Sequence, residues 1–216
     1  MSAFRSDEPA CAAGVARNAA FTVVTSRYAR CMSTPREVVM DEINIGLDMS
    51  QRSASIAILN RVLATETILM IKTKKFHWDV GGPQFVALHA FWDAQHGEMA
   101  TYVERIAERT RSLGGLPLGT AAAFIEYSAI KERPGDIPSA SVALQRLIED
   151  HETFVRTLRE DVAQCEGQIR DRGTEDLLAT LLAAHEKMAA TLRSFLEGER
   201  VVGDGRAVHG RVPRLG

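Results

Sequence analysis

The sequence has few of the residues that build β-structure or covalent cross-links. Only 6% of its 216 residues are aromatic and seven are prolines, which favours helices over a β-sandwich. The three cysteines, Cys11, Cys31 and Cys165, are odd in number and scattered, with no Cys-x-x-Cys pair. This argues against a disulfide framework or a zinc knuckle and indicates a reducing cytoplasm. A chain of this length can bury a core without cross-links, in one domain or two.

Long apolar runs and an excess of one charge are also lacking. No apolar run approaches the roughly 18 residues of a membrane span, so a membrane is not expected as a partner. Near the N-terminus, Arg17 and Asn18 interrupt the apolar residues, which argues against a secretory signal. The 28 acidic and 26 basic residues nearly balance, so any DNA affinity must come from a local patch or tail. These absences predict a cytoplasmic protein, associated with the nucleoid if it binds DNA.

The most informative stretch runs from Phe76 to Gly115 and contains three of the six histidines and both tryptophans. It turns at Gly81-Gly82-Pro83, and a proline is well suited to the first turn of a helix. No proline follows between residues 84 and 113, and Gly114 then offers a C-cap. The pattern predicts one helix of about 30 residues, roughly 45 Å long.

Four metal-ligand side chains lie within an arc of about 100° on this predicted helix, as two i,i+4 pairs. The pairs are His89 with Asp93 and Glu104 with Glu108. Because His89 and Glu104 are roughly 22 Å apart along the axis, one copy of the helix cannot bring the pairs together. Two antiparallel copies that cross near residues 96–97 can do so. The spacing therefore predicts a metal site between subunits.

The donor set of this site is imidazole and carboxylate without thiolate. Such donors suit iron or manganese before a structural zinc. An alternative stays open, because carboxylates at i,i+4 on a long helix usually form a solvated face.

A spaced series of residues covers the same stretch: His77-Trp78-(x)3-Gly82-(x)2-Phe85-(x)2-Leu88-His89-(x)3-Asp93, then Ile106-Ala107-Glu108-Arg109 and Leu113-Gly114-Gly115. This series resembles the signature of the Dps family, the mini-ferritins named as DNA-binding proteins from starved cells. The match is dense over about 40 residues and continues as a helical pattern from residue 53 to 197.

The resemblance implies an all-α fold, an antiparallel four-helix bundle with a short helix between the second and third helices. It also implies a hollow dodecamer built from two-fold dimers, with ferroxidase sites across the two-fold interface. The implied catalytic and iron-binding residues are His77, His89, Asp93, Glu104 and Glu108. Such a protein oxidises Fe²⁺ with hydrogen peroxide or oxygen, stores ferric mineral and protects DNA. The family usually has aspartate at the position of Glu104, which changes the ligand by one methylene.

A di-iron site inside the bundle, as in bacterioferritin, is the alternative within this fold class. That site needs Glu-x-x-His on two helices, and no Glu-x-x-His occurs in the sequence. The apolar residues around His151 and His185 predict that both imidazoles face the core, His151 as a packed residue rather than a ligand.

Periodic apolar residues predict the other helices at 53–78, 121–130 and 139–169, with a fourth that is capped by Thr174 and runs to about Glu197. The resemblance suggests Asp171 and Asp176 as acids lining a cation pore; acids that complement the helix dipole are an equal alternative. The predicted domains are an N-terminal extension at 1–48, a Dps domain at 49–198 and a flexible basic tail at 199–216.

The two terminal segments are the candidates for DNA binding. Five arginines and two acids precede residue 37, and four arginines and two acids follow residue 197. Twelve copies of a weak basic tail can bind DNA by avidity. A transit peptide, an over-extended start and a tail without function remain alternatives for residues 1–48. The second functional hypothesis is a DNA-compacting structural protein with weak or no ferroxidase activity.

Overall fold

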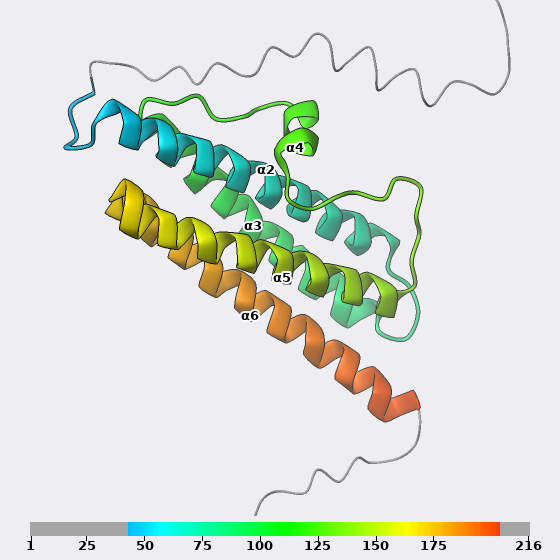
Figure 1. Cartoon of the computed structure of the whole chain (residues 1–216). Helices are drawn as coiled ribbons and strands as arrows, with labels where there is room; N and C mark the ends of the chain where they lie inside the picture. The colour runs from blue at the N-terminus through cyan, green and yellow to red at the C-terminus, as the bar shows by residue number, and fades with distance from the viewer. Residues whose placement is uncertain (1–42, 204–216) are drawn as a thin grey trace, which may run out of the picture. The chain divides into compact units, whose positions relative to one another are not determined.

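Four long helices form an antiparallel bundle in the computed structural model, which describes residues 43–203 and the side chains of residues 43–197. The long helices are α2 (Met49–Asp79), α3 (Phe85–Ser112), α5 (Ala140–Gln164) and α6 (Arg172–Gly203). Helix α2 packs mainly on α3, and α5 mainly on α6. The short helix α4 (Ala121–Tyr127) lies in the α3–α5 connection, beside α2 (Figure 1). The described part is entirely helical, which confirms the predicted fold class.

Helix α2 begins four residues before the predicted start at residue 53. A capping box, which was not predicted, precedes its first turn. The backbone N–H of Gln51 donates to Oδ1 of Asp48 at 2.8 Å, and the Gln51 side chain accepts from the Asp48 N–H at 2.9 Å. By length and composition α2 could cross a membrane, although no unbroken apolar run showed it. In the bundle, 72% of its most apolar window is buried, so it serves as a core helix.

Helix α3 has the bounds that proline and glycine predicted. At its end Gly114 has φ 87°, and its N–H donates to the Arg111 carbonyl at 2.9 Å. The Gly115 N–H donates to the Thr110 carbonyl at 2.9 Å, which completes a Schellman motif. A Cβ on Gly115 would lie 2.8 Å from Cγ1 of Ile56. Gly114 is thus required by the left-handed turn, and Gly115 is required by the close approach of α2.

The junction between α5 and α6 differs from the prediction. The α-helix ends at Gln164, and Cys165–Ile169 (η1) forms one π-helical turn before Arg170 adopts a left-handed φ of 61°. The predicted N-cap at Thr174 is wrong, because α6 begins at Arg172. Asp171 is the capping residue: its carbonyl accepts from the Glu175 N–H at 3.0 Å and its Oδ1 accepts from the Thr174 N–H at 3.1 Å. At its other end α6 continues past Glu197 to Gly203.

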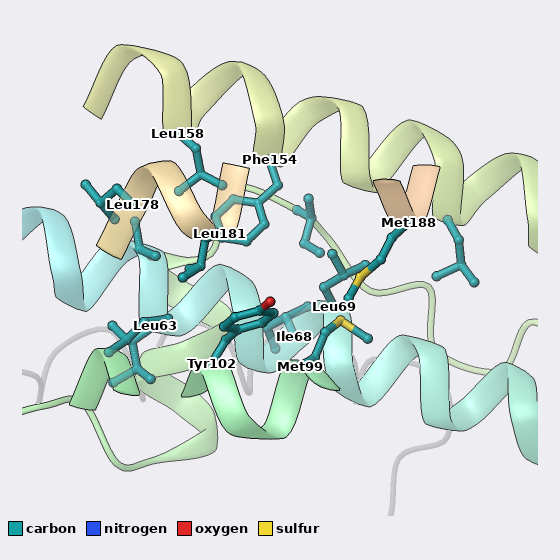
Figure 2. Packing of buried hydrophobic residues seen from close by; sticks show 14 of the residues in the cluster. Leu63, Ile68, Leu69, Met99, Tyr102, Phe154, Leu158, Leu178, Leu181 and Met188 are labelled. Carbon is teal, nitrogen blue, oxygen red and sulfur yellow. The ribbon is translucent and has the colours of Figure 1, made fainter. Parts of the chain in front are cut away.

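The core fills the space between the four long helices. Leucine, isoleucine and methionine side chains from α2, α3, α5 and α6 meet there, together with Tyr102 and Phe154 (Figure 2). His151 and His185 are fully buried in this core, which matches the predicted inward orientation of both. The predicted N-terminal extension at 1–48 and basic tail at 199–216 lie mostly outside the described residues, which leave out 1–42 and 204–216, and α6 includes residues 199–203.

Candidate metal centre

His77 is held in one tautomer by the backbone of the neighbouring helix. It lies in the last turn of α2, and its Nδ1 is 2.9 Å from the carbonyl oxygen of His89. A carbonyl only accepts, so Nδ1 carries the proton and Nε2 keeps its lone pair. A hydrogen bond of this kind is typical of metal-binding histidines. Nε2 lies 3.9 Å from Oδ1 of Asp93, too far for a hydrogen bond. His77 thus directs Nε2, an atom that can bind a metal ion, toward the carboxylate of Asp93.

His89 and Phe85 support this arrangement from the first turn of α3. The ring centroids of His77 and His89 are 3.8 Å apart and tilted by 33°. On its other side, His89 packs against Phe85 with a centroid distance of 5.0 Å. His77 is buried, His89 is half-buried and Asp93 is exposed. One subunit therefore contributes three of the five predicted ligands from the adjoining ends of α2 and α3.

The carboxylate of Asp93 also forms an ion pair with Lys74, which was not predicted from the sequence. Nζ of Lys74 donates to Oδ1 of Asp93 at 2.7 Å. This hydrogen bond and the positive charge of Lys74 lower the pKa of Asp93 below its usual value, so the group is ionised at neutral pH. Lys74 precedes His77 by one helical turn, and this spacing was the signal that could have identified it. A metal ion that binds Oδ1 of Asp93 competes with this ammonium group.

Replacing Lys74 with methionine should therefore strengthen Fe²⁺ binding. An exposed ion pair is weak because water screens it, so we expect the affinity for Fe²⁺ to rise by a few-fold at most. Anaerobic titration calorimetry with Fe²⁺ measures this change. Lys75→Met is the matched control, since Lys75 pairs with Asp79 instead. Equal affinities for the two variants would contradict competition at Asp93.

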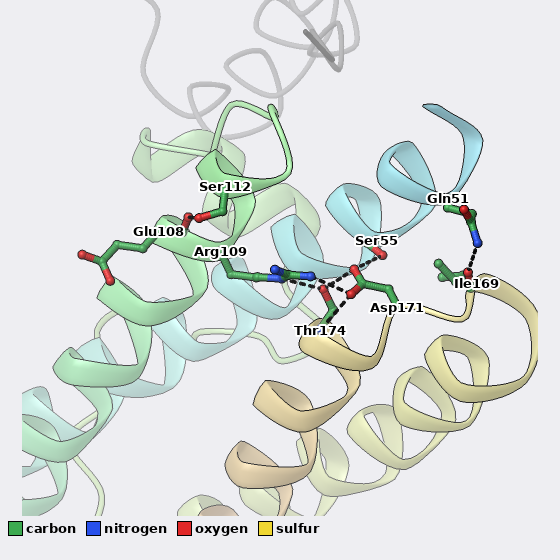
Figure 3. A network of polar contacts seen from close by, with 8 residues as sticks. All are labelled: Gln51, Ser55, Glu108, Arg109, Ser112, Ile169, Asp171 and Thr174. Carbon is green, nitrogen blue, oxygen red and sulfur yellow. Dashed lines mark hydrogen bonds and ion pairs between the residues drawn. The ribbon is translucent and has the colours of Figure 1, made fainter. Parts of the chain in front are cut away.

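Glu104 and Glu108 lie farther along α3, both exposed. Asp93 and Glu104 are eleven residues apart, roughly 17 Å along the axis. Within the described residues neither carboxylate has an ion-pair partner, and Figure 3 shows Glu108 directed away from the neighbouring Arg109 network. No group of three His, Cys, Asp or Glu side chains in the described single chain can hold a metal ion. A complete five-ligand site therefore requires a second copy.

A cavity of about 700 Å³ opens beside this centre. Lys74, Trp78, His96 and residues 131–136 are among the residues that line it. Trp78 is 69% exposed. The predicted ligands are not among the lining residues, and Lys74, which binds Asp93, connects the cavity to them.

The two acids suggested for a cation pore have different surroundings. Asp171 is 2% exposed; its Oδ1 accepts from Arg109 at 2.6 Å, and its Oδ2 accepts from Ser55 at 2.8 Å and from the Thr174 hydroxyl at 2.6 Å (Figure 3). These contacts hold Asp171 at the start of α6, where a carboxylate also complements the helix dipole, the alternative stated for this residue. Asp176 is exposed in the first turns of α6, so a pore proposal rests on Asp176.

Comparison with known proteins gives the family. The model of the ferritin-like domain matches residues 56–201. A DNA protection during starvation protein of Brevibacillus brevis is 35% identical over 142 residues, which are 65% of this chain and 93% of the relative. The chain belongs to the Dps family.

Two further relatives agree with this membership. An uncharacterized low temperature-induced protein of Nostoc sp. is 43% identical over 166 residues, 77% of this chain and 93% of the relative. The solved structure of DpsC from Streptomyces coelicolor has a TM-score of 0.73 at 28% identity, and the match covers 82% of this Dps chain and all of DpsC. The resemblance read from the sequence is thereby confirmed.

Proposed function

We propose that this Dps protein oxidises Fe²⁺ at sites shared by two subunits. His77, His89 and Asp93 of one subunit bind the iron together with Glu104 and Glu108 of the second. The observation that carries this proposal is the His77 imidazole, whose tautomer is fixed by the His89 carbonyl and whose free Nε2 faces Asp93. The ferritin-like family of the chain supports iron as the metal.

The donor atoms of the predicted ligands suit iron in both of its oxidation states. Neutral imidazole and ionised carboxylates bind Fe²⁺ and also tolerate Fe³⁺. Two Fe²⁺ ions each give one electron to hydrogen peroxide, whose O–O bond breaks. With two water molecules the products are two FeOOH units and four protons. Because iron and peroxide are consumed together, hydroxyl radicals do not form. Oxygen is the alternative oxidant.

The product and the partner are proposed from the family. We propose that the subunits assemble as two-fold dimers into a dodecameric cage, that cations enter past Asp176, and that ferric mineral collects inside. DNA would be bound without sequence preference by the segments at 1–48 and 199–216, most of which lie outside the described residues. The protein would act in the cytoplasm and protect DNA under stress, in line with the name of its Brevibacillus relative.

Stopped-flow absorbance tests the iron chemistry. Anaerobic protein loaded with Fe²⁺ is mixed with hydrogen peroxide, and we expect ferric absorbance to appear much faster than with free iron. A rate equal to that of free iron would reject the ferroxidase and leave the DNA-compacting protein as the function. A chain without residues 1–42 and 204–216 separates the two roles, since it should lose DNA retention in a gel but keep the oxidation rate.

A further inference from the structure

Glu66, His185 and His151 form a continuous polar chain inside the hydrophobic core. Nε2 of His185 lies 2.8 Å from Oε2 of Glu66, and Nδ1 of His185 lies 2.9 Å from Nδ1 of His151. The three side chains come from α2, α6 and α5, and each is 0% exposed. Phe154 packs edge-on against the His185 ring at 4.8 Å. Water therefore does not screen charges on these three side chains.

The groups that face the two imidazoles bring one formal charge. Among the described residues, α2 contributes the carboxyl group of Glu66 and α3 contributes the Tyr102 ring, 6.5 Å from His185. The Tyr102 hydroxyl donates to Glu98 at 3.1 Å; burial and this bond raise the pKa of Tyr102, so it stays neutral. Helices α5 and α6 contribute the imidazoles themselves. Charge balance therefore depends on Glu66 and on the protons of the histidine pair.

The geometry limits how many protons this pair can hold. With Glu66 ionised, which is the state the switch requires, its carboxylate only accepts, so Nε2 of His185 carries the proton of this hydrogen bond. With both rings neutral, Nδ1–H of His151 donates to Nδ1 of His185. Nε2 of His151 is then a bare acceptor, and it has no hydrogen-bond partner among the described residues. One added proton balances the charge of Glu66 and leaves both hydrogen bonds intact.

A second added proton is incompatible with the contact. Both Nδ1 atoms would then carry hydrogens at a separation of 2.9 Å, where two donors cannot form a hydrogen bond. Two like charges would also face each other in an apolar environment, where their repulsion is strong.

We propose that Glu66, His185 and His151 are a proton-controlled switch of the bundle, which tolerates one added proton and loses the His151–His185 contact between α5 and α6 when a second arrives. The proposal does not depend on the iron chemistry. Burial, and then the neighbouring His185, hold the pKa of His151 well below its usual value. An unfolded histidine takes up its proton near pH 6.5. Stability from this residue is therefore present above about pH 6.5 and lost as the pH falls below it.

Urea unfolding of the full chain at several pH values, followed by circular dichroism, tests the switch. For the wild type we expect the unfolding constant to rise by up to about tenfold per pH unit below pH 6.5, the limit for one excluded proton. His151→Gln keeps an N–H for His185 but cannot be protonated, so this contribution should disappear. Glu66→Gln still accepts from His185 but removes the balancing charge, so two protons are excluded and the rise should approach about a hundredfold per unit.

The opposite signs of the two variants separate a switch from a simple loss of packing. Contributions from other acidic groups are common to all three proteins and cancel in the comparison. Variants that are destabilised equally at every pH, with the wild-type slope, would overturn the proposal. If His151→Gln does not fold, the slope of Glu66→Gln decides alone, and a slope no steeper than that of the wild type overturns the switch.

Discussion

Two variants that are each inactive, His77→Ala and Glu108→Gln, are expected to regain iron oxidation when they assemble together. In the proposed two-fold dimer, each site takes His77 from one subunit and Glu108 from the other. A mixed dimer then has one site with both defects and one site with none. Random pairing makes half of the dimers mixed, with one of two sites intact, so about a quarter of the wild-type rate should return. Each variant alone should oxidise iron no faster than buffer.

Stopped-flow oxidation by hydrogen peroxide measures this recovery after the two variants are unfolded and refolded as an equal mixture. The matched control is a mixture of His77→Ala with His89→Ala. These two ligands lie on the same subunit, with ring centroids 3.8 Å apart, so neither site of a mixed dimer is complete and no activity should return. Recovery in the control, or its absence in the first mixture, would rule out a site divided in this way.

The sequence predicted the helix that carries the site because its ends depend on local chemistry. Pro83 lies two residues before the first residue of α3. Gly114 ends the helix because it adopts a left-handed conformation that few other residues adopt. The distance between His89 and Glu104 along the helix axis followed from helix geometry alone. His77 was different, since a histidine near a tryptophan is usually a packing residue. Only the resemblance to Dps made it a predicted ligand.

Contacts between helices were harder to predict, because periodicity shows which face is buried but not what that face meets. His185 and His151 were expected in the core, yet nothing in the sequence paired His185 with Glu66, which is 119 residues away. The ion pair of Lys74 with Asp93 was not predicted either, although the spacing of Lys74 and His77 placed the two residues on one face of α2. At the start of α6, Thr174 and Asp171 are both good capping residues, and Asp171 is the cap because its Oδ1 accepts from the Thr174 N–H.

Asp171→Ala is expected to have the largest effect on stability. The 2% exposed carboxylate accepts hydrogen bonds from Arg109, Ser55 and Thr174, and so joins α3, α2 and α6. Its removal leaves the Arg109 guanidinium without its buried partner, which costs about 3–5 kcal/mol in proteins. Arg109 keeps 24% of its side chain exposed, so we expect about 3 kcal/mol. For a chain of this size that lowers Tm by roughly 6–12 °C.

Thermal unfolding at matched protein concentration, with Asp176→Ala as the control, tests this expectation. Asp176 is exposed on the same helix, so its removal should change the free energy of unfolding by less than about 0.5 kcal/mol. The pH adds a second criterion. Burial alone would raise the pKa of Asp171, but hydrogen bonds from Thr174 and Ser55 and the charge of Arg109 hold it below its usual value. Its stabilisation is therefore present above about pH 4 and lost as the pH falls below that. The difference in Tm between the wild type and Asp171→Ala should become smaller in acid. A loss of side-chain packing alone would keep this difference constant.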